Sequence, residues 1–116
     1  MAINLSTLLN QNSVQFCKAW VNFNGTGTPA IRSSYNVSSI TKNGTGDYTV
    51  NFATAMTDAN YSVSGAAAIN GAFIVVQVTS QTTSACRIGT GYGNNGYYNV
   101  FVPADSGTIC LQIFGN

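Results

Sequence analysis

The sequence of 116 residues contains no histidine and no glutamate, and only 6% of its residues are charged, against about 25% in a typical soluble domain. Without histidine the chain lacks the commonest general base and metal ligand, and with it Ser-His-Asp and Cys-His catalysis. The carboxylates are Asp47, Asp58 and Asp105, which lie in or beside expected turns, where aspartate is common for backbone reasons alone. The positions of these aspartates in the sequence do not exclude a glycosidase that uses two carboxylates, but such an enzyme would need the fold to bring two of them together. We therefore expect a non-enzymatic protein with no catalytic residues, no metal ligands and no cofactor.

Charge of one sign and long hydrophobic runs are also scarce. The four basic and three acidic residues are scattered and leave a net charge of +1, so they form no electrostatic footprint for a phosphate backbone or anionic lipid. The segment before residue 17 has neither the basic start of a signal peptide nor the apolar length of a membrane span. We expect no nucleic-acid partner, no membrane insertion, and synthesis in the cytoplasm.

Cysteine is present but not in a pattern that indicates a disulfide framework or a metal site. Cys17, Cys86 and Cys110 are odd in number and lack metal-ligand spacing. Each lies in a strand-like run, where a free cysteine usually acts as a small buried hydrophobe. Their redox state is left open by the sequence.

Short runs rich in Val, Ile, Thr, Tyr and Phe fill the chain after residue 15, separated by clusters of glycine and asparagine. This pattern predicts an all-β fold, a compact antiparallel β-sandwich, jelly-roll-like, of about eight strands with a short N-terminal extension. The expected strands are Gln15–Phe23, Ala30–Ile40, Tyr48–Phe52, Tyr61–Ala67, Phe73–Ser80, Ala85–Thr90, Tyr97–Val102 and Thr108–Phe114.

Three of these runs alternate with period two and so predict the core. The expected core faces are Tyr48, Val50 and Phe52, then Ile74, Val76 and Val78, then Ile109, Leu111 and Ile113. The run 73–76 is apolar on both faces, which fits either a central strand or a strand whose outer face meets a partner subunit.

Four Asn-Gly dipeptides, which begin at Asn24, Asn43, Asn70 and Asn95, separate the runs. Because both residues tolerate positive φ, Asn-Gly favours type I′ hairpin turns. Antiparallel hairpins are therefore expected at these places.

Helical signal is confined to Leu5–Val14, where Leu5, Leu8 and Leu9 fall on one side. A helix this short does not hold in water unless it packs on a surface. We expect residues 1–16 to be an N-terminal tether or docking segment, with these three leucines as assembly contacts, and residues 17–116 to be the β-sandwich module.

The segment from Gly91 to Tyr98 combines aromatic rings with amide groups. Tyr92, Asn94, Asn95, Tyr97 and Tyr98 could stack on a sugar or a protein while hydrogen-bonding its polar edges. The alternative is that the last two tyrosines are ordinary strand residues with one ring in the core. We take the five as receptor- or glycan-contact candidates.

Several motifs resemble a recurrent module of phage structural proteins. They are KAWVNFNGTGT from Lys18, AIR from Ala30, NVSSI from Asn36, NGTGDYTVNF from Asn43, MTDANY from Met56 and the closing IFGN from Ile113. The chain from about residue 17 to 116 is similar to the C-terminal domain of tail-fibre-like proteins of tailed phages of cyanobacteria and marine bacteria. The resemblance implies a non-enzymatic β-domain on the virion surface, homotrimeric as phage fibres commonly are, that contacts other phage structural proteins and brings no catalytic residues.

In such fibres the module follows a long shaft, whereas about sixteen residues precede it in this sequence. The expected role is therefore a virion structural protein: a capsid decoration or spike, a small tail or baseplate component, or a tail-fibre tip docked on a separate shaft. It would stabilise the particle and could meet a host-surface glycan or protein. The main alternative is a free carbohydrate-binding, lectin-like module.

Overall fold

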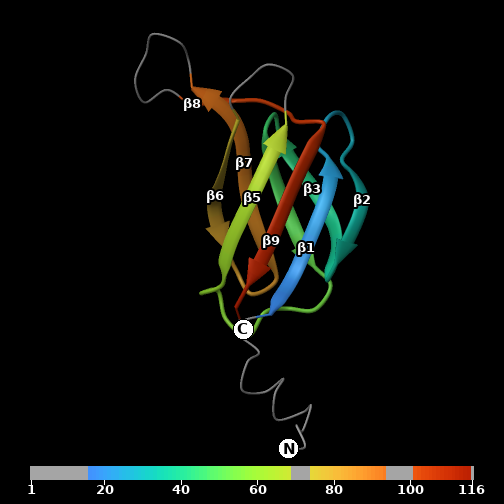
Figure 1. Cartoon of the computed structure of the whole chain (residues 1–116), viewed down its shortest axis with the longest axis vertical. Coiled ribbons are helices and arrows are strands. Elements are labelled where there is room, and N and C mark those ends of the chain that lie inside the picture. The colour runs from blue at the N-terminus through green and yellow to red at the C-terminus, as the bar shows by residue number, and fades with distance from the viewer. Residues whose placement is uncertain (1–15, 69–73, 94–100, 116) are drawn as a thin grey trace, which may run out of the picture.

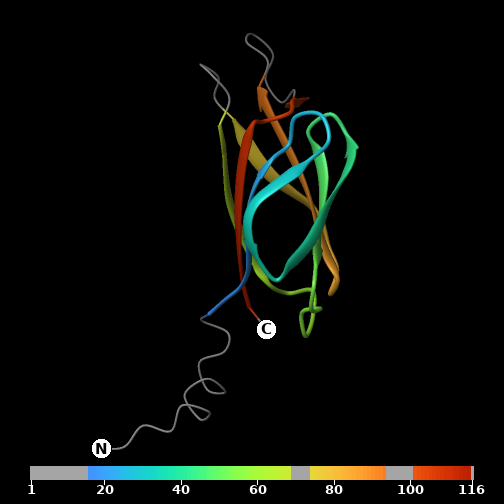
Figure 2. The same ribbon diagram turned by 90° about the vertical axis from the view of Figure 1, so that its right-hand side faces the viewer.

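The computed structural model describes residues 16–68, 74–93 and 101–115. Within these ranges the chain forms strands and no helix, and every strand pair is antiparallel. Two sheets pack face to face, as the edge-on view in Figure 2 shows, so the predicted all-β antiparallel sandwich is confirmed.

The four-stranded sheet A and the five-stranded sheet B are each built from strands that are distant in sequence (Figure 1). Sheet A has the order β2 (Ala30–Tyr35), β1 (Cys17–Asn24), β9 (Thr108–Phe114) and β5 (Ser62–Ala68). Sheet B has the order β3 (Val37–Gly44), β4 (Asp47–Phe52), β7 (Ala85–Gly93) and β6 (Val75–Gln81), and the short β8 (Phe101–Pro103) pairs with the end of β7.

The core is made by the alternate residues of four central strands. Period-two alternation places one face of each strand inside, and the fully buried side chains include Phe23, Tyr48, Ile88 and Leu111. The predicted core faces of β4 and β9 are confirmed. The largest rings pack edge to face: the centroids of Phe23 and Tyr48 are 5.4 Å apart, a favourable geometry for aromatic pairs.

The expected strand Ala30–Ile40 is in fact two strands in different sheets. The chain turns sharply at Asn36, which has a φ of 55°, so β2 ends in sheet A and β3 begins in sheet B. The Asn36 side chain holds this corner: its Nδ2 donates to the carbonyls of Lys18 and Thr54, each at 3.1 Å, and its Oδ1 accepts from the Thr54 amide at 2.6 Å. Asparagine tolerates the left-handed region better than other non-glycine residues, which explains its place here.

Strand β6 lies at an edge of sheet B, so it is not a central strand. The predicted core face of this strand is wrong in part: Val78 is 42% exposed, whereas Ile74 and Val76 are half-buried and Val76 packs against the core. The register between β6 and β7 shifts after Val78, which turns the strand away from the core.

Two Asn-Gly turns fall within the described residues, and neither is a type I′ hairpin. Asn43-Gly44 closes β3, and the two-residue turn is Thr45-Gly46, where only Gly46 has positive φ. Asn24 ends β1 before a longer loop, and its Oδ1 accepts from the amide of Thr26 at 2.9 Å. The dipeptides at residues 70 and 95 lie outside the described residues.

A polar cluster closes the upper end of the sandwich, the top in Figure 1. Asp105 Oδ2 lies 2.7 Å from Lys42 Nζ, and Oδ1 accepts from the amide of Gly46 at 2.9 Å. The Tyr48 hydroxyl reaches out of the core to within 3.0 Å of the same Oδ1 and 2.9 Å of the Gly25 carbonyl. The cluster therefore joins three loops to each other and to the core.

Candidate functional site

The outer face of sheet A carries three exposed aromatic rings from three different strands. Trp20 on β1 pairs directly with Tyr35 on β2 and with Gln112 on β9, so all three point to the same face, and Phe114 follows two residues after Gln112. The rings are 38% (Trp20), 57% (Tyr35) and 40% (Phe114) exposed. We call these three residues the aromatic face.

Two cations accompany the aromatic face. Arg32 lies across sheet A, where its Nη1 donates to Asn22 Oδ1 at 3.1 Å and its Nη2 donates to the Gly107 carbonyl. Lys18 lies at the start of β1. Within the described residues the salt bridges join Lys42 to Asp105 and Arg87 to Asp47, and neither Arg32 nor Lys18 takes part in one. Among the described residues, then, no salt bridge neutralises the positive charge of Arg32 and Lys18 on sheet A.

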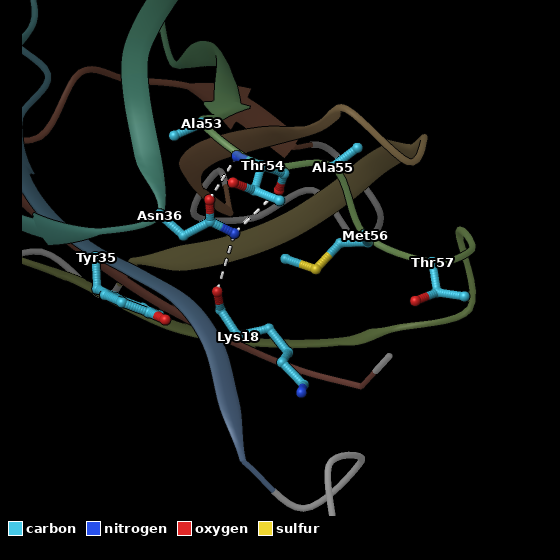
Figure 3. A pocket seen from close by; sticks show the side chains of 8 residues that line it. All are labelled: Lys18, Tyr35, Asn36, Ala53, Thr54, Ala55, Met56 and Thr57. Atoms are coloured by element: carbon cyan, nitrogen blue, oxygen red, sulfur yellow. Dashed lines mark hydrogen bonds between the residues drawn. The ribbon is translucent and has the colours of Figure 1, made fainter. Parts of the chain in front are cut away.

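A hollow of about 530 Å³ opens at the lower end of the sandwich, next to the aromatic face (Figure 3). It lies between the start of β1 and the loop that follows β4, and Tyr35 and Lys18 line it on the sheet A side. The Asn36 amide and Met56 form its inner wall, and Met56 is buried. Because Tyr35 borders both features, the hollow extends the aromatic face around the end of the sandwich.

On the outside of sheet B, Arg87 and Asp47 form an ion pair. Arg87 Nε and Nη2 donate to Asp47 at 2.9 and 2.6 Å. The hydrogen bond from Arg87 holds the pKa of Asp47 below its usual range, so this carboxyl is charged at neutral pH. Such a pair gives a fixed, neutralised surface and no free acid.

Among the residues predicted from sequence, only one of the receptor-contact candidates lies in the described part of the chain. Tyr92 is near the end of β7 at the upper end of the sandwich and is 38% exposed. Asn94, Asn95, Tyr97 and Tyr98, like the assembly candidates Leu5, Leu8 and Leu9, lie outside the described residues. Their roles stay predictions.

The aromatic face is not among the sites predicted from the sequence. Its signal was present in the run from Lys18 to Phe23, where Trp20 alternates with the buried Ala19 and Val21 and is therefore on the outer face. What the run does not show is that Tyr35 and Phe114 come to lie beside it, because that depends on the pairing of β1 with β2 and β9.

The cysteines are free thiols, and burial raises the pKa of Cys86 to about 11. The described ranges contain no cluster of Cys, Asp or Glu side chains that could hold a metal ion, and no helix long and apolar enough to cross a membrane. Comparisons of the chain with protein-family models, with curated proteins and with solved structures found no match.

Proposed function

We propose that this chain is a non-enzymatic structural module of a bacteriophage particle surface, and that it assembles through the aromatic face of sheet A. The observation that carries the proposal is the grouping of Trp20, Tyr35 and Phe114 on one exposed sheet face. Exposed tryptophan and tyrosine are enriched at protein interfaces, where their rings provide most of the contact energy. The virion assignment itself comes from the resemblance of the sequence motifs to phage fibre domains.

Covering the aromatic face would contribute several kcal/mol to the free energy of association. If each ring has roughly 200 Å² and about 40% of it is exposed, covering all three removes ~250 Å² of mostly apolar surface from water. At about 25 cal/mol per Å² this contributes ~6 kcal/mol before the entropic costs of association. The cations Arg32 and Lys18 beside the rings favour a partner surface that offers carboxylates or backbone carbonyls.

A homotrimer is the assembly that we propose. A closed ring of identical subunits needs two different surfaces on each copy that fit one another. The chain offers a second exposed apolar side chain on the edge strand β6, Val78, which is 42% exposed. In the proposed trimer the aromatic face of one copy covers this edge of the next, which also protects an edge strand from uncontrolled pairing.

The single tryptophan of the chain lies on the aromatic face and reports on its burial. We expect sedimentation equilibrium to give a trimer mass, and tryptophan emission to shift to shorter wavelength and resist acrylamide quenching as concentration rises. Tyr35→Ser should weaken association by roughly tenfold or more for each contact, from the loss of ~100 Å² of apolar contact.

Tyr92→Ser is the matched control, since Tyr92 is also an exposed tyrosine (38%, against 57% for Tyr35) and lies at the other end of the sandwich. It should leave the mass unchanged. A chain that stays monomeric at high concentration, or one in which Tyr35→Ser and Tyr92→Ser behave alike, would refute assembly through the aromatic face. An electron-microscopy map of the intact particle tests the virion assignment directly.

A further inference from the structure

A second hollow, on the outer face of sheet B and far from the aromatic face, has the composition of a small binding site. It has a volume of about 270 Å³ and lies where the pairing of β4 with β7 stops and that of β8 with β7 begins. Its lining comes from the turn between β3 and β4, from β6, and from β8. We call it the β7 groove.

Gly89 is the residue of β7 that lines the β7 groove, and it has no side chain to fill it. Gly89 and Gly91 occupy consecutive outward positions of the strand, on the same face as Arg87. The ring of Phe101 leans over Gly91, where a Cβ atom would come within 2.7 Å of its Cζ. The Gln77 side chain leans over Gly89 from the other side, with Nε2 only 3.3 Å from where a Cβ would be. Glycine in a strand often marks a close approach of this kind.

One wall of the groove is therefore aromatic and the others are polar. Phe101 and Pro103 line the β8 side, and Gln77 and Thr79 line the β6 side. The Gln77 side chain lines the groove and is exposed, and its amide can both donate and accept hydrogen bonds.

The carboxylate of Asp47 completes the polar lining. Arg87 donates two hydrogen bonds to it and Asn43 Nδ2 donates a third at 3.4 Å, which fixes its position and keeps it charged. A carboxylate can accept about four hydrogen bonds, so Asp47 retains acceptor capacity for a hydroxyl group. The ion pair also neutralises the site, which disfavours a charged ligand.

We propose that the β7 groove binds one neutral pyranose ring of a surface glycan. The apolar face of a pyranose would stack on Phe101, and its hydroxyl groups would donate to Asp47 and exchange hydrogen bonds with the Gln77 amide. The volume is just below the ~300–1,000 Å³ of sites for drug-sized ligands, so the groove accommodates a single ring. With so few contacts the expected affinity is on the order of millimolar.

The test is an NMR titration of the full-length ¹⁵N-labelled protein with D-galactose, D-glucose, D-mannose and N-acetyl-D-glucosamine, each to roughly 50 mM. We expect at least one sugar to shift the backbone amide of Gly89 and the side-chain amide of Gln77. Gln77→Ala and Phe101→Ala should each weaken that binding about tenfold or more.

The matched controls are Gln112→Ala on the outer face of sheet A and Phe16→Ala at the exposed ring immediately before β1 of sheet A, which make the same changes away from the groove. They should leave the titration unchanged. Phe101→Leu keeps the apolar contact of β8 and removes the flat ring, so it tests stacking if Phe101→Ala fails to fold. The proposal is overturned if none of the four sugars shifts these amides, if the shifts cluster on sheet A, or if the sheet A variants weaken binding as much as the groove variants.

Discussion

Replacing Asp105 tests how far one polar cluster holds the upper end of the sandwich together. The carboxylate accepts hydrogen bonds from Lys42 Nζ at 2.7 Å, from the amide of Gly46 at 2.9 Å, and from the Tyr48 hydroxyl at 3.0 Å. Asp105→Ala removes all three. Asp105→Asn keeps an acceptor oxygen for Gly46 and Tyr48 but removes the charge that faces Lys42.

The magnitude follows from what each variant leaves behind. Hydrogen bonds to charged groups contribute about 1.5–3 kcal/mol each, but three bonds to one side chain do not add fully. Lys42 also keeps the carbonyls of Gly25 and Gly27, each at 3.1 Å, and the Lys42 and Asp105 side chains are 22% and 27% exposed, so water replaces part of the loss. We expect Asp105→Ala to lower the free energy of unfolding by about 2–4 kcal/mol and Asp105→Asn by about 1–2 kcal/mol.

The pH dependence of this difference identifies the charge as its cause. Burial by itself raises the pKa of Asp105, but the hydrogen bonds from Lys42, Gly46 and Tyr48 outweigh it and hold the pKa below its ordinary value. The stabilisation is therefore complete above the unfolded pKa of about 3.9 and is lost as the pH falls through the lower folded pKa. Urea unfolding followed by Trp20 fluorescence should show a constant gap between the wild type and Asp105→Asn from about pH 8 to about pH 5, and a narrower gap near pH 3. A gap below about 0.5 kcal/mol at neutral pH, or one that does not narrow in acid, would refute the reasoning.

Three further predictions concern backbone and thiol chemistry. Gly46 has a φ of 63°, and a Cβ atom at this position would collide with the loop after β8, so Gly46→Ala should lower the free energy of unfolding in urea by about 2–4 kcal/mol. A Cβ atom at Gly44 would have no atom within 4 Å, so Gly44→Ala should lower it by less than about 1 kcal/mol. Asn36→Ala should be less stable than Asn36→Gly by about 1 kcal/mol, because both lose the side-chain hydrogen bonds but only alanine is strained at a φ of 55°; equal melting temperatures would contradict this. Cys86 is fully buried and its pKa is raised to about 11, so iodoacetamide near pH 8 should label it only after the protein unfolds. The half-buried Cys110 should react in the folded protein. Mass spectrometry of the labelled peptides distinguishes the two cysteines.

The sequence predicts the core of this fold well because burial imposes a period of two on the central strands. Tyr48, Val50 and Phe52 alternate with exposed or half-exposed polar residues, and the same holds for β9 around Leu111. The prediction for Val78 was wrong because β6 is an edge strand, and hydrophobic alternation does not say which strand lies at the edge. Edge position is set by pairing across long sequence separations, which local pattern does not encode.

The same limit explains the split of the expected strand Ala30–Ile40. Its residues favour an extended chain throughout, and only Asn36 marks the change of sheet. That signal is weak, since asparagine is abundant in this sequence. The aromatic face and the β7 groove cannot be predicted from local pattern for a further reason. Each brings together residues from strands distant in sequence, such as Trp20 with Phe114 and Gln77 with Phe101.

The proposed trimer requires the aromatic face to be covered, whereas the proposed sugar site requires the β7 groove to stay exposed. The aromatic face and the β7 groove lie on the outer faces of different sheets. In the proposed trimer the aromatic face also meets the β6 edge of the next copy. The contact there is made by Val78, which is one residue from the groove residue Gln77 and therefore points to the opposite face of sheet B, so the groove stays open. Sheet B is also suited to exposure, because its outer face carries polar side chains that satisfy one another: the Asn51 amide donates to Ser39 and Thr41 at 3.1 and 3.0 Å. The two functions should therefore be separable by mutation. Tyr35→Ser should abolish the trimer and keep sugar binding at Gly89, whereas Gln77→Ala should do the reverse, and loss of both properties in either variant would show that the two faces do not act independently.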